Sequence, residues 1–395
     1  MPLMTRSFDW RPFRLIPVVV GALVLLVVVA GSGLGRVSQV SDPARAQAMW
    51  PWNPVAPIAI AQAILVAKPD AAGADRAESL ARRALQLDAS QALAYSVLGM
   101  AMDVKHDPRG RELILLSDRF SRRLLLSRIW LIEDAVNRGD IDTALRNYDI
   151  ALRTSGEAPA LLFPVLLNAA ADPNITDKLA KLLRARPLWR DAFLAELTQK
   201  GDPLVAYSVL RAGVGSKIPE SARQSLVARL VAANRPDLAY GLAAAGITPL
   251  HNDVAVDLAR SPGRLAPFGW SLSTTDMVDA SQDIDGTFVA QTRSNTPQTA
   301  ISRLVALAPG QYVMAARGEF RSGSGTARWT ASCFGGNPLG AIPATGGSSS
   351  TGFSVPAGCA FQWLRLEVTA SLDADHVEAV ITSYRVAPLT AAAKD

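Results

Sequence analysis

The sequence changes its residue pattern at Ser261-Pro262-Gly263. Residues 52–260 are rich in Ala, Leu and Arg, with apolar residues at helical spacing, whereas the residues that follow form short β-branched runs separated by Gly, Ser and Thr. Helix and strand patterns in separate parts of a chain favour separate domains. We therefore predict a multidomain chain, with a helical domain at residues 44–260, an all-β sandwich at residues 262–388 and a tail at residues 389–395.

A second constraint is the run at residues 15–34, which contains no charged residue. An apolar helix of about 20 residues spans the hydrocarbon core of a bilayer. Three arginines and one aspartate precede the run, so the positive-inside rule predicts residues 1–14 in the cytoplasm. The expectation is a single-pass protein of a bacterial inner membrane, with its later domains in the periplasm. A cleaved signal peptide is the alternative, and it exports the same domains.

Small and large residues recur in a fixed order around turns in the helical region. The positions are Ala77, Ala81, Ala84, Tyr95, Leu98 and Gly99 in one copy, and Gly139, Ala144, Tyr148 and Ala151 in another. Small residues let two helices pack closely, and large ones fill the gap to the next helix pair. This order resembles the tetratricopeptide repeat. The resemblance implies an α-solenoid of helical hairpins that binds protein partners.

Weaker copies of the pattern lie at residues 194–213 and 226–243, and residues 52–64 resemble a first, capping hairpin. We interpret residues 105–121 as an insertion that lengthens a connection. An unrelated helical domain with an Ala and Leu core is the alternative to the repeat interpretation.

Arginines are spread along the helical region, with Asp and Glu between them. They are suited to an acidic partner, either a protein or an anionic polysaccharide. The interspersed carboxylates favour solvated helix faces instead. Nucleic acid is not expected as a partner outside the cytoplasm. The arginines in question include Arg82, Arg83, Arg122, Arg123, Arg128, Arg184 and Arg186.

Eight short runs with turn residues between them predict the strands of the β domain. They lie at residues 268–272, 287–293, 300–307, 310–320, 327–334, 352–355, 360–370 and 377–386, with a long small-residue loop at 335–351. The opening Phe268-Gly269-Trp270, the turn into Tyr312 and the closing strand resemble jelly-roll, galactose-binding-like domains. Such domains often serve as carbohydrate-binding modules, so the resemblance implies a polysaccharide as a further partner.

Two features of the β domain are candidates for a covalent bond and for ligand contact. In an oxidising compartment, Cys333 and Cys359 are expected to form a disulfide, with two free buried thiols as the alternative. Aromatic rings are the usual platforms for sugar rings, and the same rings also fill cores. The candidates for stacking are Trp270, Tyr312, Trp329 and Trp363. The aspartates at 283 and 285 and at 373 and 375 are interpreted as surface turns rather than calcium sites.

Catalytic chemistry finds no support in the motifs. The chain has three widely spaced histidines and two cysteines, and it lacks a nucleophile elbow, a phosphate loop and a dinucleotide fingerprint. We expect no catalytic residue, no metal and no cofactor. The expected function is a non-enzymatic, membrane-anchored periplasmic scaffold, which resembles accessory proteins of bacterial exopolysaccharide or capsule systems. A general envelope assembly factor whose β domain binds protein is the alternative.

Overall fold

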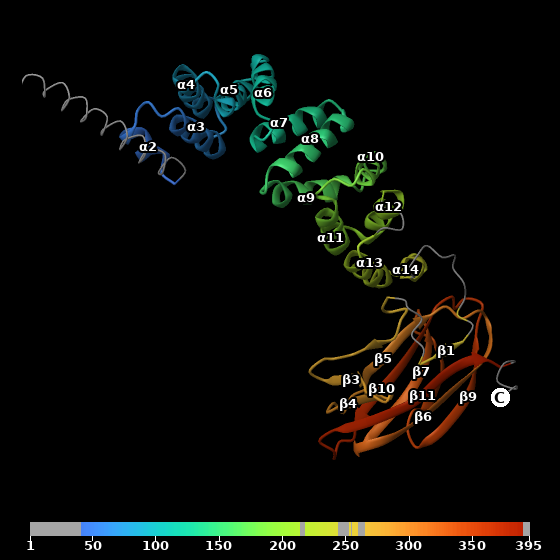
Figure 1. The fold of residues 1–395 in the computed structure, drawn as a ribbon. Helices are drawn as coiled ribbons and strands as arrows, with labels where there is room; N and C mark the ends of the chain where they lie inside the picture. The colour runs from blue at the N-terminus through green and yellow to red at the C-terminus, as the bar shows by residue number, and fades with distance from the viewer. Residues whose placement is uncertain (1–40, 214–217, 244–252, 254, 260–264, 390–395) are drawn as a thin grey trace, which may run out of the picture. The chain divides into compact units, whose positions relative to one another are not determined.

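The computed structural model describes residues 41–213, 218–243, 253, 255–259 and 265–389 (Figure 1). The predicted membrane segment at residues 15–34 lies outside these ranges. Among the described residues, no helix combines the length and the hydropathy that crossing a bilayer requires. Contacts divide the chain into two compact units, one ending at Val165 and the next beginning at Leu166.

The first part of the described chain is helical, and the last part is an antiparallel β-sandwich, as predicted. The helices are α2 (Pro43–Met49), α3 (Val55–Ala67), α4 (Ala71–Leu87), α5 (Ala92–Val104), α6 (Arg109–Phe120), α7 (Leu125–Asn137), α8 (Ile141–Thr154), α9 (Ala158–Ala169), α10 (Pro173–Arg184), α11 (Arg190–Lys200), α12 (Pro203–Gly213), α13 (Glu220–Ala232) and α14 (Pro236–Ala243).

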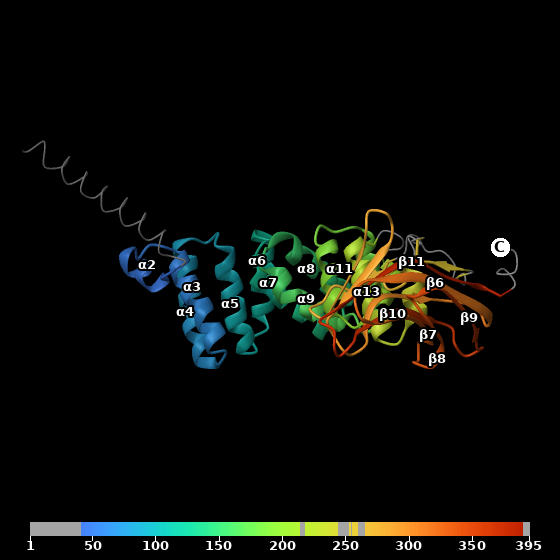
Figure 2. The ribbon, with the colours of Figure 1, turned by 90° about the horizontal axis from the view of Figure 1, so that it is seen from below.

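Helices α3, α4 and α5 of the first unit lie side by side (Figure 2). They share one apolar core. Ala77, Ala81 and Ala84 of α4 are fully buried in it, beside residues of α3 and α5. Methyl side chains let the helix backbones approach each other, because nothing larger separates them. The predicted small positions of α4 therefore lie at close helix contacts.

Helix α6 corrects the expectation of an insertion at residues 105–121. It packs on α5 where two glycines meet: a Cβ on Gly99 would lie 2.6 Å from Ile114 Cγ1 and 2.7 Å from the Gly110 carbonyl oxygen. Only glycine allows so close a crossing. The segment was misread because its arginines interrupt the apolar pattern, although Ile114 is fully buried against the neighbouring helix.

Helices α7 and α8 pack as a further pair. The turn between them contains Gly139 at a φ of +70°, a conformation that favours glycine at the end of a helix. Asp140 then caps α8 by accepting a hydrogen bond from the Thr143 backbone N–H at 3.0 Å. The predicted positions Ala144, Tyr148 and Ala151 are buried on the face of α8 that enters the core.

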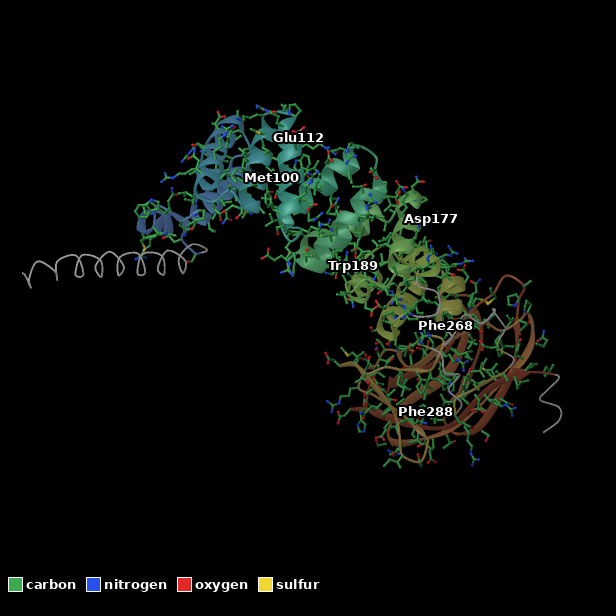
Figure 3. The ribbon with its side chains drawn as sticks, turned by 45° about the horizontal axis from the view of Figure 1, so that its top comes forward. Met100, Glu112, Asp177, Trp189, Phe268 and Phe288 are labelled. Atoms are coloured by element: carbon green, nitrogen blue, oxygen red, sulfur yellow. A yellow bond between two sulfur atoms is a disulfide. The ribbon has the colours of Figure 1, made fainter. Side chains whose placement is uncertain are left out.

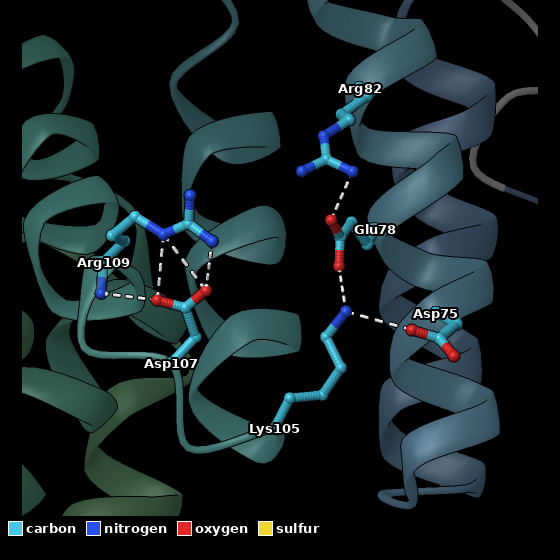
Figure 4. Close-up of polar contacts among 6 residues, drawn as sticks. All are labelled: Asp75, Glu78, Arg82, Lys105, Asp107 and Arg109. Atoms are coloured by element: carbon cyan, nitrogen blue, oxygen red, sulfur yellow. Dashed lines mark hydrogen bonds and ion pairs between the residues drawn. The ribbon is translucent and has the colours of Figure 1, made fainter.

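Charged side chains join α4 to the end of α5 (Figure 4). Lys105 Nζ donates to Asp75 Oδ1 at 3.0 Å and also bonds Glu78, which pairs in turn with Arg82. Glu78 is buried, and a buried charge needs a partner. Lys105 and Arg82 balance it from two sides. The cluster fixes the C-terminal end of α5 on the first turns of α4.

In the second unit, the last helix contacts the sandwich through aromatic rings. The Tyr240 ring of α14 lies 5.1 Å from that of Phe268 and 5.7 Å from that of Phe361. Figure 3 marks the position of Phe268. Beside them, the Arg303 guanidinium lies 3.6 Å from an Asp253 carboxylate oxygen, and both side chains are buried. Asp253 also accepts a hydrogen bond from the Ala306 backbone N–H at 2.9 Å. This buried ion pair holds Asp253 against β5 (Gln298–Val305).

The described part of the sandwich consists of two antiparallel sheets, ordered β3-β4-β11-β6-β9, with β1 also paired to β11, and β2-β5-β10-β7-β8. The strands are β1 (Val256–Asp257), β2 (Ser271–Leu272), β3 (Val278–Gln282), β4 (Phe288–Thr292), β5 (Gln298–Val305), β6 (Gly310–Gly323), β7 (Gly325–Cys333), β8 (Pro338–Pro343), β9 (Gly347–Val355), β10 (Gln362–Ala370) and β11 (Val377–Pro388).

The prediction of a loop at residues 335–351 is wrong, because most of these residues form β8 and the start of β9. Both strands lie at sheet edges, where β8 pairs with β7 and β9 pairs with β6. Their Gly, Ser, Ala and Pro residues have low strand propensity, so the pairing partner rather than the local sequence makes them strands. Strand β3 was missed for the same reason.

The disulfide prediction is confirmed: Cys333 at the end of β7 is bonded to Cys359 in the loop before β10. Both cysteines are buried in the sandwich core. The bond encloses β8 and β9, the two edge strands that depend most on their neighbours.

Candidate functional site

The two ends of the sandwich carry different structures. Strands β5, β7 and β9 end where β10 begins, and this end carries the disulfide, the Asp253–Arg303 pair and the contacts with α14. At the opposite end, β6 turns into β7 and β10 leads into β11. We call this opposite end the distal end. Two surface cavities lie there.

A row of polar side chains crosses four strands near the distal end. The register pairs Asp279 of β3 with Gln291 of β4, Gln291 with Glu378 of β11, and Glu378 with Ser322 of β6. Cross-strand neighbours point to the same face of a sheet. Since the residues on either side of Asp279, Gln291 and Glu378 in their strands are buried, these three side chains point outward.

Asp279, Gln291 and Glu378 of this row form one wall of a cavity of about 350 Å³, which we call the polar cleft. Its lining residues are Thr275, Asp276, Met277, Val278, Asp279, Gln291, Thr292, Arg293, His376 and Glu378. Gln291 Nε2 donates to Asp279 Oδ2 at 3.3 Å. Ser322 Oγ shares a hydrogen bond with His376 Nε2 at 2.9 Å and donates to Glu378 Oε2 at 3.3 Å. These bonds orient the row before any ligand arrives.

The polar cleft offers both acceptors and donors to a ligand. Asp276, Asp279 and Glu378 supply carboxylate oxygens, which accept several hydrogen bonds each. Gln291 adds an amide, and Arg293 adds guanidinium donors. Arg321 of β6 donates to Glu378 Oε1 at 3.1 Å and balances that carboxylate. Asp276 and Asp279 remain against Arg293 and leave the cleft a small excess of negative charge. The cleft suits a neutral molecule rich in hydroxyl groups better than an anion.

A second cavity, of about 370 Å³, lies on the other side of the β6–β7 turn. We call it the Phe320 groove, after the aromatic ring at its edge, which is 39% exposed. The remaining lining residues are Gly325, Thr326, Ala327, Arg328, Ala341, Ile342, Pro343 and Thr345. Arg328 is held by Glu367, with Nε donating to Oε2 at 3.0 Å. The groove thus joins an exposed ring to a positioned guanidinium and two hydroxyls.

The structure places three of the four predicted stacking residues in or against the core. Trp329 is fully buried, and its ring stacks on Tyr384 at 3.8 Å. Tyr312 is buried beside Phe353, and Trp270 packs against the core with its Nε1 donating to the Asp257 carbonyl. Trp329 and Tyr312 therefore present no open ring face to a sugar, which corrects the expectation for these two, whereas Trp270 is partly exposed.

Trp363 is the remaining candidate. It is half-buried on the outer face of β10, and the Arg365 guanidinium lies 4.7 Å from its ring centroid. One ring face is therefore occupied by a cation–π contact. The structure does not bring Trp363 together with the polar cleft, because the two lie on different sheets.

The Ser322–His376 hydrogen bond pairs a hydroxyl with an imidazole, as a nucleophile and its base would be paired. Glu378 contacts the Ser322 hydroxyl rather than the His376 ring in the bonds described above, so no carboxylate orients the imidazole there. Within the described residues, no group of three His, Cys, Asp or Glu side chains is placed to hold a metal ion. Asp285 caps a surface turn by accepting from Thr287.

Sequence reasoning missed the polar row because its members come from four strands far apart in the chain. Alternation within each strand indicates which residues point outward. It does not indicate which strands lie side by side. Only the pairing register brings Asp279 and Ser322 into the same row.

No family model and no curated protein matches the chain. Among solved structures, a family 61 carbohydrate-binding module (TmCBM61) in complex with β-1,4-galactotriose is 13% identical, with a TM-score of 0.23, over 30% of this chain and 88% of that one. A family 4 module is 11% identical, with a TM-score of 0.25, over 31% and 88% of the two chains.

Accessory secretory protein 1, 2 and 3 of Streptococcus pneumoniae is 6% identical, with a TM-score of 0.23, over 36% of this chain and 99% of that one. Scores this low lead to no functional conclusion.

Proposed function

We propose that this chain is a non-enzymatic binding protein whose sandwich binds a neutral glycan at its distal end. The supporting observation is the polar row Asp279, Gln291, Glu378 and Ser322, which carries acceptors and donors on one open face. Sugar hydroxyls both donate and accept, so they match such a row. Phe320 is paired with the buried Ala379, so its ring lies on the other face of this sheet from the row, where its exposed part offers an apolar surface on which a sugar ring can stack.

The wider proposal concerns the whole chain. In it, residues 15–34 anchor the protein in a bacterial inner membrane with the N-terminus inside, and the later domains lie in the periplasm. The helix pairs act as a tetratricopeptide-like array for protein partners, and the sandwich acts as a jelly-roll glycan-binding module. Such a scaffold fits exopolysaccharide or capsule synthesis and export. The alternative is an envelope assembly factor whose sandwich binds protein.

The glycan proposal is tested by calorimetric titration of the full-length chain with neutral β-linked hexose oligosaccharides and with oligogalacturonate. We expect a neutral oligosaccharide to bind and the anionic one not to bind. Asp279→Asn and Glu378→Gln should each weaken binding about 3- to 10-fold, because one hydrogen bond contributes roughly 0.5–1.5 kcal/mol. Phe320→Ala should weaken it by a similar factor through lost stacking.

Matched controls are Glu157→Gln and Leu188→Ala, which change exposed residues of the helical part. Both should bind like the unchanged chain. Absence of binding to every neutral oligosaccharide, or equal affinities for the distal-end variants and the controls, would contradict glycan binding at this end and favour the assembly factor.

The topology proposal is tested with reporter fusions placed directly after Arg36 and at the C-terminus. A reporter that works only outside the cytoplasm should be active at both points, because the positive-inside rule places everything after the apolar run on that side. Activity of a cytoplasmic reporter at either point would contradict the proposed compartment.

A further inference from the structure

A third cavity, of about 280 Å³, lies in the first unit among α6, α7 and α8. We call it the arginine groove. Five arginines and two aspartates line it, so positive charge is in excess. Its lining residues are Arg111, Leu115, Asp118, Arg122, Arg128, Leu131, Asp134, Arg138, Thr143, Arg146, Asn147 and Ile150.

Arg128 connects the helices that form the groove. Its side chain is 2% exposed, and its donors are directed to three fixed acceptors. Nη1 donates to Asn147 Oδ1 at 2.7 Å, Nε donates to the Arg122 carbonyl oxygen at 3.3 Å, and Nη2 bonds Asp118. Because these bonds join α6, α7 and α8, they set the spacing of the helices that carry the other arginines.

The arginines of the rim are exposed and held in place. Arg111 Nε and Arg138 Nη2 approach the two oxygens of Asp134 at 3.4 and 2.8 Å, and both arginine side chains are nearly half exposed. Arg146 Nη2 donates to Thr143 Oγ1 at 2.6 Å. A guanidinium has five N–H donors, so each of these side chains retains donors for a ligand beyond the bonds described here.

Between the arginines, the floor of the groove is apolar. Leu131 is buried, and Leu115 and Ile150 are half-buried. A sugar polymer with carboxylates has no aliphatic side chain to cover such a floor. A peptide that carries a leucine-sized residue between carboxylates matches both the floor and the rim.

We propose that the arginine groove binds an acidic peptide segment of a partner protein, with carboxylates on Arg111, Arg138 and Arg146 and an aliphatic side chain on the floor. Guanidinium groups bind carboxylates through two parallel hydrogen bonds, which a lysine cannot reproduce. This deepens the protein-binding half of the proposed function and rests on it. The groove is formed by α6, α7 and α8, so it joins two consecutive helix pairs.

The test is fluorescence polarisation with the full-length chain at about 0.15 M salt, where only direct ion pairs persist. The probe is the labelled peptide Glu-Asp-Glu-Leu-Asp-Glu. It is compared with a peptide in which Gln and Asn replace Glu and Asp, and with a peptide in which serine replaces leucine. We expect the acidic leucine peptide to bind, and both comparison peptides to bind at least about tenfold more weakly. Unlabelled polygalacturonate should not displace it.

The variants separate charge from geometry. Arg146→Gln should weaken peptide binding about tenfold, and Arg146→Lys should restore only part of the loss because it keeps the charge without the fork. Arg76→Gln removes an exposed arginine of α4 outside the groove and should have no effect. Circular dichroism confirms that each variant is folded.

Three results would overturn the proposal: no binding of the acidic peptide, equal affinities for Arg146→Gln and the unchanged chain, or displacement of the peptide by polygalacturonate. Equal binding of the serine peptide would overturn the role of the apolar floor. The same samples are titrated with neutral oligosaccharide. Loss of glycan binding with peptide binding intact would count against the sandwich proposal only, so the two failures are distinguishable.

Discussion

At the scale of single residues, Trp329 and Tyr384 show what the sandwich core requires. Their rings stack at 3.8 Å, in a fully buried position between the two sheets. Neither the Trp329 Nε1 nor the Tyr384 hydroxyl has a hydrogen-bond partner among the described residues. Burial raises the pKa of Tyr384, so the phenol stays neutral. Trp329 and Tyr384 therefore stabilise the core through the apolar area of their rings rather than through their polar atoms.

We predict that Tyr384→Phe stabilises the sandwich by about 1 kcal/mol, because it removes a buried hydroxyl that lacks a partner and keeps the ring. Urea unfolding of the full-length chain, followed by the fluorescence of the buried tryptophans, measures the change. Tyr148→Phe in α8 is the control for losing a hydroxyl outside the sandwich. A clear destabilisation by Tyr384→Phe would mean that the hydroxyl is bonded.

Asp107 gives a second prediction at this scale. Hydrogen bonds from the Arg109 side chain and backbone N–H hold the pKa of Asp107 at about 2, below its ordinary value of 3.8. A carboxyl group whose pKa is lower in the folded than in the unfolded chain contributes stability at pH values above its unfolded pKa. That stability is lost as the pH falls through the folded pKa. The loss should therefore occur between about pH 4 and pH 2. Because Asp107 is only partly buried and its partner Arg109 is exposed, the effect should be small and sensitive to salt.

A carboxyl titration by NMR checks the value directly, with a midpoint expected near pH 2 for Asp107. Arg109→Ala should move the midpoint toward 3.8, because it removes the side-chain donor that lowers the pKa. A midpoint near 3.8 in the unchanged chain would contradict the bonding described for this loop.

At the scale of helices and strands, the sequence predicts elements whose side chains fill a core and misses elements that depend on a neighbour. Helix α4 and strand β10 carry clear helical and alternating patterns, and both were predicted. Helix α6 was missed because arginines break its apolar pattern. Strand β8 was missed because Pro, Gly and Ala give no strand signal, although its hydrogen bonds to β7 make it a strand.

At this scale, we predict how removing the disulfide changes the stability of the sandwich. Replacing Cys333 and Cys359 with serine should destabilise the sandwich by about 3 to 4 kcal/mol, because the chain-entropy model assigns this value to a closed loop of this length. Helices α3 to α8 should unfold unchanged, since the bond lies in the other unit. Urea unfolding with separate signals for tryptophan fluorescence and helical circular dichroism measures both effects. An unchanged sandwich transition would contradict the prediction.

At the scale of the whole molecule, the change from helix to strand near residue 261 predicted the two-part architecture, and the binding surfaces were not predictable. The polar row needs the register of four strands, and the arginine groove needs three helices that Arg128 holds together. A single sequence contains the side chains of these surfaces but not their neighbours. The aromatic residues chosen from the sequence illustrate this, because two of the four are buried in the core and a third packs against it.

The location of the glycan site is the central claim, and hydrogen exchange measured by mass spectrometry tests it most directly. The full-length chain is compared with and without the neutral oligosaccharide that binds it in titration. We predict slower exchange at residues 274–279, 291–296 and 373–378, which form the polar cleft and its loops, and unchanged exchange at residues 361–367 around Trp363. Protection confined to residues 361–367, or to the helices, would contradict a glycan site at the distal end.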